Sequence, residues 1–270
     1  MRAKRDLIRV AARCRGIERI EAHFQGNGFS PHRHDTYALG ITIAGVQTFR
    51  YRGISRFSLP GNVIVLHPDE VHDGGAGNQD GLVYRMLYLP PAIIGKVAGD
   101  ASLALPFVRE PVIDDHVFAR ALHDLLADLA HAPDDLLVDD ALLRIVAGLR
   151  RNGSMTPRSG GSTAVNAVSM CKDYLEAHAT QPVFAQQLEA VCGINRYELA
   201  RHFRRHLGTS PHRYLIMRRL ELARLQLHAG TPPAEIAVAV GFADQAHFNR
   251  HFKKTYGMTP GRWLALSRAS

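Results

Sequence analysis

Three histidines in the N-terminal half have the residue type and spacing of a metal or ligand site. His32 and His34 stand two residues apart, so on a strand both imidazoles would point to one side. His72 closes a later run, residues 60–72, that reads PGNVIVLHPDEVH. Imidazole binds iron, nickel, copper and zinc, and two imidazoles with one carboxylate form the iron site of oxygenases. The pattern predicts either a metal centre or the polar part of a small-molecule pocket.

The residues around these histidines bear on that choice. The run around His72 resembles the second motif of cupin barrels, and in metal-binding cupins a glutamate follows the histidine pair by a few residues. Here residues 37–39 read Tyr-Ala-Leu, without a carboxylate. We therefore expect no metal. The candidate ligands, if a metal does bind, are His32, His34 and His72. The expected alternative is an effector pocket with an apolar wall and a few polar groups. Its candidate residues, for each of which a structural role stays open, are His32, His34, Tyr37, His72 and Arg85.

A second set of residues, in the C-terminal half, is suited to DNA recognition. Residues 199–215 and 248–264 repeat at an offset of 49, with Arg, His, Phe, Gly, Pro, Arg and Leu at matching positions. Arginine can pair with guanine, and asparagine or glutamine with adenine. The predicted base-reading residues are Arg196, Tyr197, Arg201, Gln245, His247, Asn249 and Arg250. The predicted phosphate contacts, for which a solvated charged face is the alternative, are Arg204, Arg205, Lys253 and Lys254.

The charge distribution favours nucleic acid as the partner of the C-terminal half. The chain of 270 residues has a net charge of +8. Residues 1–150 contain 17 basic and 18 acidic residues, whereas residues 151–270 contain 16 and 7, so the halves carry −1 and +9. A positive field confined to one part favours a polyanion, with nucleic acid ahead of a membrane surface. The three widely spaced cysteines predict reduced thiols and a cytoplasmic protein.

Each copy of the repeat is predicted to fold as a helix-turn-helix unit. A short apolar-periodic helix, over 184–191 or 234–240, is followed by a glycine turn, an N-cap residue and a basic helix. The long helix expected over 210–228 spans roughly 28 Å at about 1.5 Å per residue. That length is comparable to the roughly 34 Å between successive major-groove segments on one face of a duplex. One chain is thus predicted to contact two successive groove segments.

The N-terminal half is predicted to be an all-β barrel followed by a helical hairpin. Short apolar or alternating runs between residues 18 and 90 are separated by Gly and Pro turns. Two helical stripes with 4-3-4 spacing follow, and they could either cover the barrel or form a dimer seam. The stripe residues are Phe118, Leu122, Leu125 and Leu129, then Val138, Leu142, Ile145 and Leu149.

These elements give a two-domain organisation. We expect a cupin-like effector-binding and dimerisation domain over 1–150, with its helical hairpin at 116–149. A linker rich in Gly and Ser follows over 151–163. The DNA-binding domain, with two helix-turn-helix units, is expected over 164–270. The basic segment 2–15 is interpreted as a frayed end or an arm.

Residues 165–266 resemble the DNA-binding domain of the AraC/XylS family of bacterial transcription regulators. The resemblance is carried by GFADQAHFNRHFKK at 241–254 and GMTP at 257–260. It implies an N-terminal cupin-like sensor, a transcriptional rather than an enzymatic function, and no cofactor. The implied partners are double-stranded DNA, a small-molecule effector, RNA polymerase and a second copy of the chain bound through residues 116–149. The alternative is a metal-dependent cupin enzyme, an oxygenase or isomerase, with an appended helical domain.

One position departs from the family pattern. Glu189 in the first unit stands where the family usually keeps a small residue, as Ala237 does in the second. The first unit is therefore expected either to pack less tightly or to turn Glu189 outward.

Overall fold

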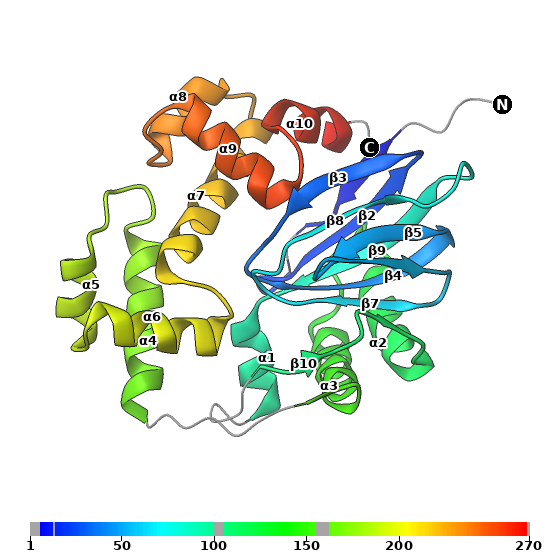
Figure 1. Cartoon of the computed structure of the whole chain (residues 1–270), viewed down its shortest axis with the longest axis horizontal. Coiled ribbons are helices and arrows are strands. Elements are labelled where there is room, and N and C mark those ends of the chain that lie inside the picture. Colours follow the sequence, from blue (N-terminus) through cyan, green and yellow to red (C-terminus); the bar gives the residue numbers. More distant parts are fainter. Residues whose placement is uncertain (1–5, 13, 100–104, 155–161, 269–270) are drawn as a thin grey trace.

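The computed structural model describes residues 6–12, 14–99, 105–154 and 162–268 (Figure 1). Within these ranges a β-rich N-terminal part with a helical hairpin precedes a wholly helical C-terminal part, which confirms the predicted fold class. The helical part lies along one side and one end of the β-rich part (Figure 1). None of the described helices is long and apolar enough to cross a lipid bilayer.

Two large antiparallel sheets form most of the N-terminal part. The larger has the order β1-β2-β9-β4-β7-β11, with strands Leu7–Val10, Glu18–Phe24, Leu82–Leu89, Tyr37–Gly45, Val63–Leu66 and Val112–Ile113. The smaller has the order β3-β8-β5-β6, with strands Asn27–His32, His72–Ala76, Gln47–Tyr51 and Ile54–Ser58. Side chains of both sheets, including Phe24, Phe49 and Tyr51, pack into one core between them.

The larger sheet is buried on both faces. In β4, Ala38 belongs to the core between the sheets, whereas Leu39 and Ile41 belong to a second core under the helices. The helices on that outer face are α1 (Pro91–Ala98), α2 (His116–Leu126) and α3 (Asp135–Arg151). A strand covered on both faces has a continuous apolar run rather than an alternating one, which explains the sequence of residues 37–41.

The two helical stripes cover this sheet instead of forming a dimer seam. All eight stripe residues lie in the core under α2 and α3, and none is more than 7% exposed. The sequence left open whether the stripes cover the sheet or form a dimer seam. The structure shows that they cover the sheet, because each of these side chains is already buried within one chain. The outward face of α3 carries Leu136 and Leu143, which are 78% and 58% exposed.

Both ends of α2 are capped from outside the helix. At the N-terminus the Asp115 carboxylate accepts a hydrogen bond from the Phe118 amide at 2.9 Å. At the C-terminus Arg19 of β2 donates to the carbonyl oxygens of Leu125, Asp128 and His131. Arg85 of β9 donates to those of Leu126 and Ala127. These arginines satisfy the last carbonyls of the helix and favour its negative end.

The segments expected as an arm and as a linker are partly built into the β-rich part. Residues 7–10 form β1, which pairs with β2 from Leu7↔His23 to Val10↔Ile20, so this stretch is not a frayed end. Helix α3 continues to Arg151, and β12 (Gly153–Ser154) pairs with β10 (Phe107–Val108). Residues 155–161 of the expected linker lie outside the described residues.

The C-terminal part contains two helix-turn-helix units around one long helix. The helices are α4 (Ser162–Ala177), α5 (Ala185–Cys192), α6 (Arg196–Leu207), α7 (Pro211–His228), α8 (Pro233–Ala239), α9 (Gln245–Tyr256) and α10 (Pro260–Arg268). Helix α7 runs between the unit α5–α6 and the unit α8–α9 (Figure 1). The basic helices α6 and α9 end at Gly208 and Gly257, whose φ values of 72° and 65° form left-handed caps.

Candidate functional site

The two basic helices are built alike. Asn195 caps α6 by accepting from the amides of Tyr197 and Glu198, and Asp244 caps α9 by accepting from the amide of His247. The inner face of each helix is apolar, and its outer face carries the predicted DNA contacts. The buried residues of these inner faces include Leu199, Phe203 and Leu207 in α6 and Phe248 and Phe252 in α9. Burial of one face leaves the other available to a groove of DNA.

Five of the seven predicted base-reading side chains are exposed. Tyr197 is 78% exposed, and Arg196, Arg201, Gln245 and Arg250 are also exposed. The other two, His247 and Asn249, are half-buried. The imidazole of His247 packs 4.7 Å from that of His251 and 5.4 Å from the Phe242 ring. The exposed side chains could therefore contact DNA where they lie, whereas the His247 ring would first have to leave its contacts with His251 and Phe242.

The unusual Glu189 is turned outward and contacts α6. Its carboxylate accepts from the Arg196 guanidinium at 2.9 and 3.0 Å and from the Arg196 amide at 2.8 Å. Hydrogen bonds from Arg196 lower the pKa of Glu189, so the carboxylate is ionised at neutral pH. Arg196 is held against its own unit, and this pair must open before Arg196 can reach a base.

The predicted phosphate contacts occupy the last turns of the same helices. The side chains of Arg204, Arg205, Lys253 and Lys254 are all exposed. Because these ends also meet the β-rich part, the positive side chains stand beside a protein contact. The backbone carbonyl of Lys254, for example, accepts a hydrogen bond from the Arg33 amide at 3.0 Å.

The two cap glycines of the repeat both abut the β-rich part. The Gly257 carbonyl accepts from the Ser30 amide at 2.9 Å, and a Cβ on Gly257 would lie 2.8 Å from the Ser30 oxygen. A Cβ on Gly208 would lie 2.7 Å from the Cβ of Pro68. Glycine is thus required at these positions for close approach as well as for positive φ. The β-rich part holds both basic helices by their C-terminal ends.

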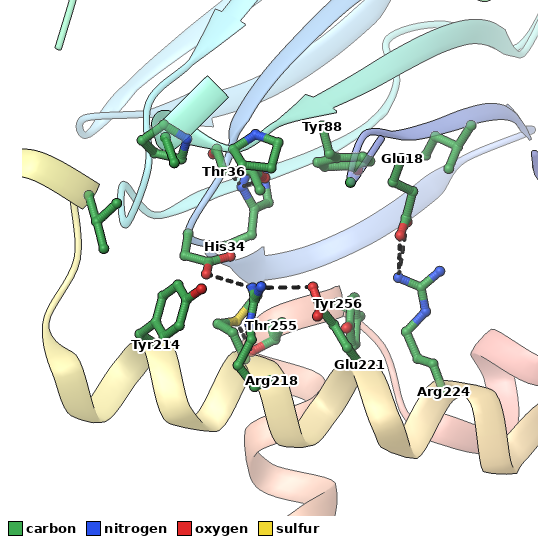
Figure 2. A pocket seen from close by; sticks show the side chains of 18 of the residues that line it. Glu18, His34, Thr36, Tyr88, Tyr214, Arg218, Glu221, Arg224, Thr255 and Tyr256 are labelled. Atoms are coloured by element: carbon green, nitrogen blue, oxygen red, sulfur yellow. Dashed lines mark hydrogen bonds and ion pairs between the residues drawn. The ribbon is translucent and has the colours of Figure 1, made fainter. Parts of the chain in front are cut away.

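Ion pairs from α7 complete this interface (Figure 2). Arg218 contacts Asp35 at 2.9 Å, and Arg224 contacts Glu18 at 2.8 Å. Asp35 is buried, and the side chains of Glu18 and Arg224 are only 13% and 11% exposed. Burial by itself would lower the pKa of Arg218 and Arg224. The facing carboxylates of Asp35 and Glu18 outweigh this effect and raise both pKa values above the usual one, so both guanidinium groups stay charged. Removing one member of such a pair leaves a buried charge without its partner.

A cavity of about 320 Å³ lies between the two parts. Its β-side wall includes apolar side chains such as Ile8, Ile20 and Phe29, and its helical wall includes Met217 and Trp263. The interface ion pairs line the same cavity, together with Lys172, Glu176, Tyr214 and Glu221. Figure 2 shows Arg218 and Arg224 reaching from α7 towards the opposite wall. The cavity can hold a molecule with an apolar body and a charged or polar end.

Three of the five predicted effector residues gather beside this cavity. The His72 ring lies 4.3 Å from that of His32 and 4.9 Å from that of His34. One ring nitrogen of each lies within 4.8 Å of the others, and all three residues are buried. His32 and His34 line the cavity. Burial lowers the pKa of His72 to about 4 and those of His32 and His34 well below the usual value, so the rings are neutral at pH 7.

The other two, Tyr37 and Arg85, do not line the cavity. Tyr37 points to the opposite face of the larger sheet, where its hydroxyl donates to the Pro106 carbonyl at 2.8 Å. Arg85 binds Glu21 at 2.7 Å and caps α2. Strand alternation explains both positions, because neighbouring residues of β4 and β9 face different cores. Both polar groups are already occupied by structural partners.

Sequence reasoning missed the residues of α7 that meet the β-rich part. The signal was present, since residues 211–228 show no continuous polar stripe, and a helix that is apolar on several sides is buried on several sides. Arg213 and Arg224 are buried in this helix, and they pair with Asp69 and Glu18 of the β-rich part. The long helix is therefore part of the interface as well as a spacer.

Two family models match the chain. One, described as an AraC-like ligand binding domain, matches residues 16–146, and the other, a helix-turn-helix domain, matches residues 188–265. The first covers strands β2 to β11, helices α1 and α2, most of α3 and the three histidines, whereas the second covers both basic helices.

Relatives span most of the chain. The uncharacterised HTH-type transcriptional regulator YbfI of Bacillus subtilis is 26% identical over 84% of this chain and 85% of its own length. The HTH-type transcriptional activator RhaS of Yersinia pestis is 25% identical over 89% and 91%. ToxT of Vibrio cholerae shares the fold, with a TM-score of 0.65 at 12% identity over 96% of this chain and 98% of that one. These relatives are regulators, so the cupin-enzyme alternative has no support, and the chain belongs to the AraC family of DNA-binding transcription regulators with an N-terminal ligand-binding domain.

Proposed function

We propose that this regulator couples DNA binding to a small molecule held between its two domains. The observation that carries the proposal is the cavity whose walls come from β1, β2 and β3 on one side and from α7, α9 and α10 on the other. Such a cavity is complete only while the domains are docked. A ligand that touches both walls must therefore bind the docked arrangement more tightly and shift the population towards it.

Docking bears on DNA recognition because it holds both basic helices. The cap glycines at the ends of α6 and α9 contact the β-rich part through Pro68 and Ser30. The first turns, which carry Arg196, Tyr197 and Gln245, stay exposed. The domain contact thus fixes the relative orientation of two helices that we propose to enter successive major-groove segments. A ligand that stabilises docking then changes the affinity for DNA.

The lining favours an amphipathic organic acid as the effector. Apolar side chains make up much of both walls. Lys172, Arg218 and Arg224 each pair with a carboxylate of the same lining, and the carboxylate of a ligand would bind by taking the place of such a partner. ToxT, whose fold this chain shares, has been solved with an unsaturated fatty acid and with (E)-4-(8-methylnaphthalen-1-yl)but-3-enoic acid. Both molecules are carboxylic acids with an apolar body. We propose the same chemical class for this cavity.

A homodimer and a contact with RNA polymerase complete the proposed function. The hairpin at 116–149 stays the proposed dimer element, now through its outward face, where Leu136 and Leu143 are exposed. Two exposed leucines seven residues apart lie on one side of a helix and suit pairing with a second copy. The contact with RNA polymerase rests on the family, in which the relative RhaS is described as a transcriptional activator.

The first experiment selects bound DNA from a random pool with the full-length protein and then maps its footprint. The expected footprint protects two adjacent major-groove segments per protomer. Protection of one segment would contradict the use of both basic helices. No preference for any sequence over bulk competitor would contradict the DNA-binding function.

The second experiment tests the effector site by thermal shift with a series of fatty acids and aryl-substituted alkenoic acids. An acid that binds should raise the melting temperature and change the affinity for the selected DNA. Val10→Trp, which places an indole on the cavity wall, should abolish the response. Val117→Trp on the exposed face of α2 is the matched control and should respond like the wild type. Equal responses of both variants would place the acid elsewhere.

A further inference from the structure

We propose that His32, His34 and His72 bind one divalent transition-metal ion, and that this ion strengthens the contact between the two domains. The inference does not depend on the organic effector, because metal binding can be measured without DNA or a carboxylic acid. It reverses our expectation from the sequence, which rested on the missing carboxylate.

The hydrogen bonds of the three rings determine which nitrogen is free. Nδ1 of each ring contacts a backbone carbonyl oxygen: His32 to Ser30 at 2.9 Å, His34 to Thr36 at 2.9 Å and His72 to Glu70 at 3.0 Å. A carbonyl only accepts, so each Nδ1 must carry the hydrogen. In a neutral imidazole the lone pair is then on Nε2. Metal-binding histidines are usually oriented in this way, with the distal N–H donated to a carbonyl or carboxylate.

The three buried rings lie close together, with one nitrogen of each within 4.8 Å of the others. Nε2 of His34 is buried and has no hydrogen-bond partner among the described residues. Zinc at about 2.1 Å from each nitrogen requires nitrogens about 3.4 Å apart. A pair of rings at the 4.8 Å limit would therefore have to move together by about 1.4 Å on metal binding. Unprotonated imidazole nitrogens at such distances repel one another, so a cation or a hydrogen-bond donor between them would stabilise the cluster.

A fourth buried histidine of the same domain shows the contrasting, structural arrangement. His67 is as buried as the cluster residues, at 6% exposure. Its Nε2 accepts from the Val108 amide at 2.9 Å, and its Nδ1 lies 2.8 Å from the Tyr51 hydroxyl. Both ring nitrogens of His67 are therefore satisfied within the protein. Burial alone does not explain the free nitrogens of the cluster.

The donor set limits the class of metal. Imidazole nitrogen is a borderline ligand that suits zinc, copper, nickel, cobalt and iron, whereas calcium and magnesium require oxygen ligands. No carboxylate or thiol of the described residues joins the group. Three protein ligands leave at least one coordination position open, as in catalytic rather than closed structural zinc sites. His32 and His34 line the interdomain cavity, so we place the open position on that side.

The same short segment holds two of the three metal ligands and the domain contacts. His32 and His34 alternate with Arg33 and Asp35, and these two contact the helical domain. The Arg33 amide donates to the Lys254 carbonyl at 3.0 Å, its carbonyl accepts from Arg213, and Asp35 pairs with Arg218 at 2.9 Å. An ion that fixes both histidines fixes the backbone between them. Metal binding should therefore lower the free energy of the docked arrangement.

The first test measures metal binding by the full-length protein after removal of metal with a chelator. Titration with cobalt(II) should give a visible absorption spectrum of nitrogen coordination at one ion per chain, and zinc should displace the cobalt. His34→Ala and His72→Asn should each weaken binding by at least roughly 100-fold, since they remove direct ligands. His67→Gln is the matched buried control and should keep wild-type affinity. Magnesium and calcium should not compete.

The second test measures hydrogen–deuterium exchange with and without zinc. The amides of Ser30 and Arg33 donate across the domain interface, so zinc should slow their exchange in the wild type by at least roughly threefold. His72→Asn, whose side chain lies outside this segment, should show no zinc effect at either amide.

The outcomes separate the parts of the proposal. A protein that binds no stoichiometric transition metal overturns it, as does equal loss of binding in His67→Gln and His34→Ala. Stoichiometric binding without slower exchange overturns the link to docking. The two proposals can fail separately. If the wild type binds no transition metal but His72→Asn still shows a thermal shift with organic acids, the metal site is contradicted and the proposed effector function is not.

Discussion

At the scale of single residues, arginine has several different roles that composition does not separate. Arg19 and Arg85 cap the C-terminal end of α2. Arg218 and Arg224 join the two domains, whereas Arg250 lies exposed on a basic helix. The guanidinium group is always charged and has five donors, so its partners decide its role. The following two predictions separate these roles.

Arg250→Ala should weaken binding to the selected DNA by about 1–3 kcal/mol and relax the base preference at one position, because a base contact is lost. Lys253→Ala should weaken binding to all sequences alike, since a phosphate contact carries no sequence information. Competition binding at a fixed salt concentration measures both effects. An equal loss on selected and random DNA for Arg250→Ala would remove its base-reading role.

Arg85→Ala should destabilise the N-terminal domain by about 1–3 kcal/mol, because its donors to the α2 carbonyls and to Glu21 are lost. The response to an organic acid should persist, since Arg85 does not line the cavity. Chemical denaturation and thermal shift measure the two effects. Arg120→Ala, an exposed residue of α2, is the control and should leave stability unchanged. Loss of the acid response with intact stability would return Arg85 to the effector site.

At the scale of elements, one amphipathic pattern is compatible with two kinds of packing. The 4-3-4 stripes of α2 and α3 are equally suited to a sheet and to another helix, because both present an apolar surface. The structure buries the stripes against the larger sheet and leaves Leu136 and Leu143 on the outside. A dimer formed through this hairpin would therefore use the outward face of α3 and not the residues of the 4-3-4 stripes.

Leu143→Lys should convert a homodimer into a monomer without unfolding, because a charge on the outward face of α3 opposes pairing with a second copy. The neighbouring Leu142 is only 3% exposed, so Leu142→Lys should instead unfold the domain. Sedimentation equilibrium and circular dichroism distinguish the two results. If Leu143→Lys keeps the oligomeric state of the wild type, the outward face of α3 is not the dimer interface.

At the scale of the whole molecule, the interface links the sensor to the DNA-binding domain. Residues far apart in sequence, such as Glu18 with Arg224 and Asp35 with Arg218, meet there. These pairs, the cavity and the histidine cluster lie together between the domains. A ligand or ion bound at this interface can change the relation of the two domains without any change inside either one.

Glu18→Gln should weaken docking, because it leaves the buried Arg224 without its charged partner. Exchange at the Ser30 and Arg33 amides should become faster, and the radius of gyration from X-ray scattering should increase. Glu21→Gln is a matched control on the same strand, because Glu21 pairs with Arg85 within the N-terminal domain. It should lower stability without faster exchange at the interface. The same exchange pattern in both variants would contradict a role for Glu18 in docking.

The sequence by itself determined what is local and periodic. The helix-turn-helix units, their Asn195 and Asp244 caps and the glycine ends follow from short-range patterns, since capping and helix periodicity depend on neighbours within a few residues. The expectation that strand alternation would pair His32 with His34 was wrong in its reason, because β3 ends at His32 and His34 lies in the following loop, with its ring 6.1 Å from that of His32.

Only the tertiary structure decided which faces meet. It placed Tyr37 and Arg85 away from the cavity, covered the sheet with the helical stripes and brought α7 against the β-rich domain. The ion pair of Glu18 with Arg224 spans 206 positions of sequence. Such contacts depend on how whole surfaces fit together. The hydrophobic effect is not directional, so it favours burial of an apolar surface without specifying which other surface covers it. No local pattern specifies its distant partner.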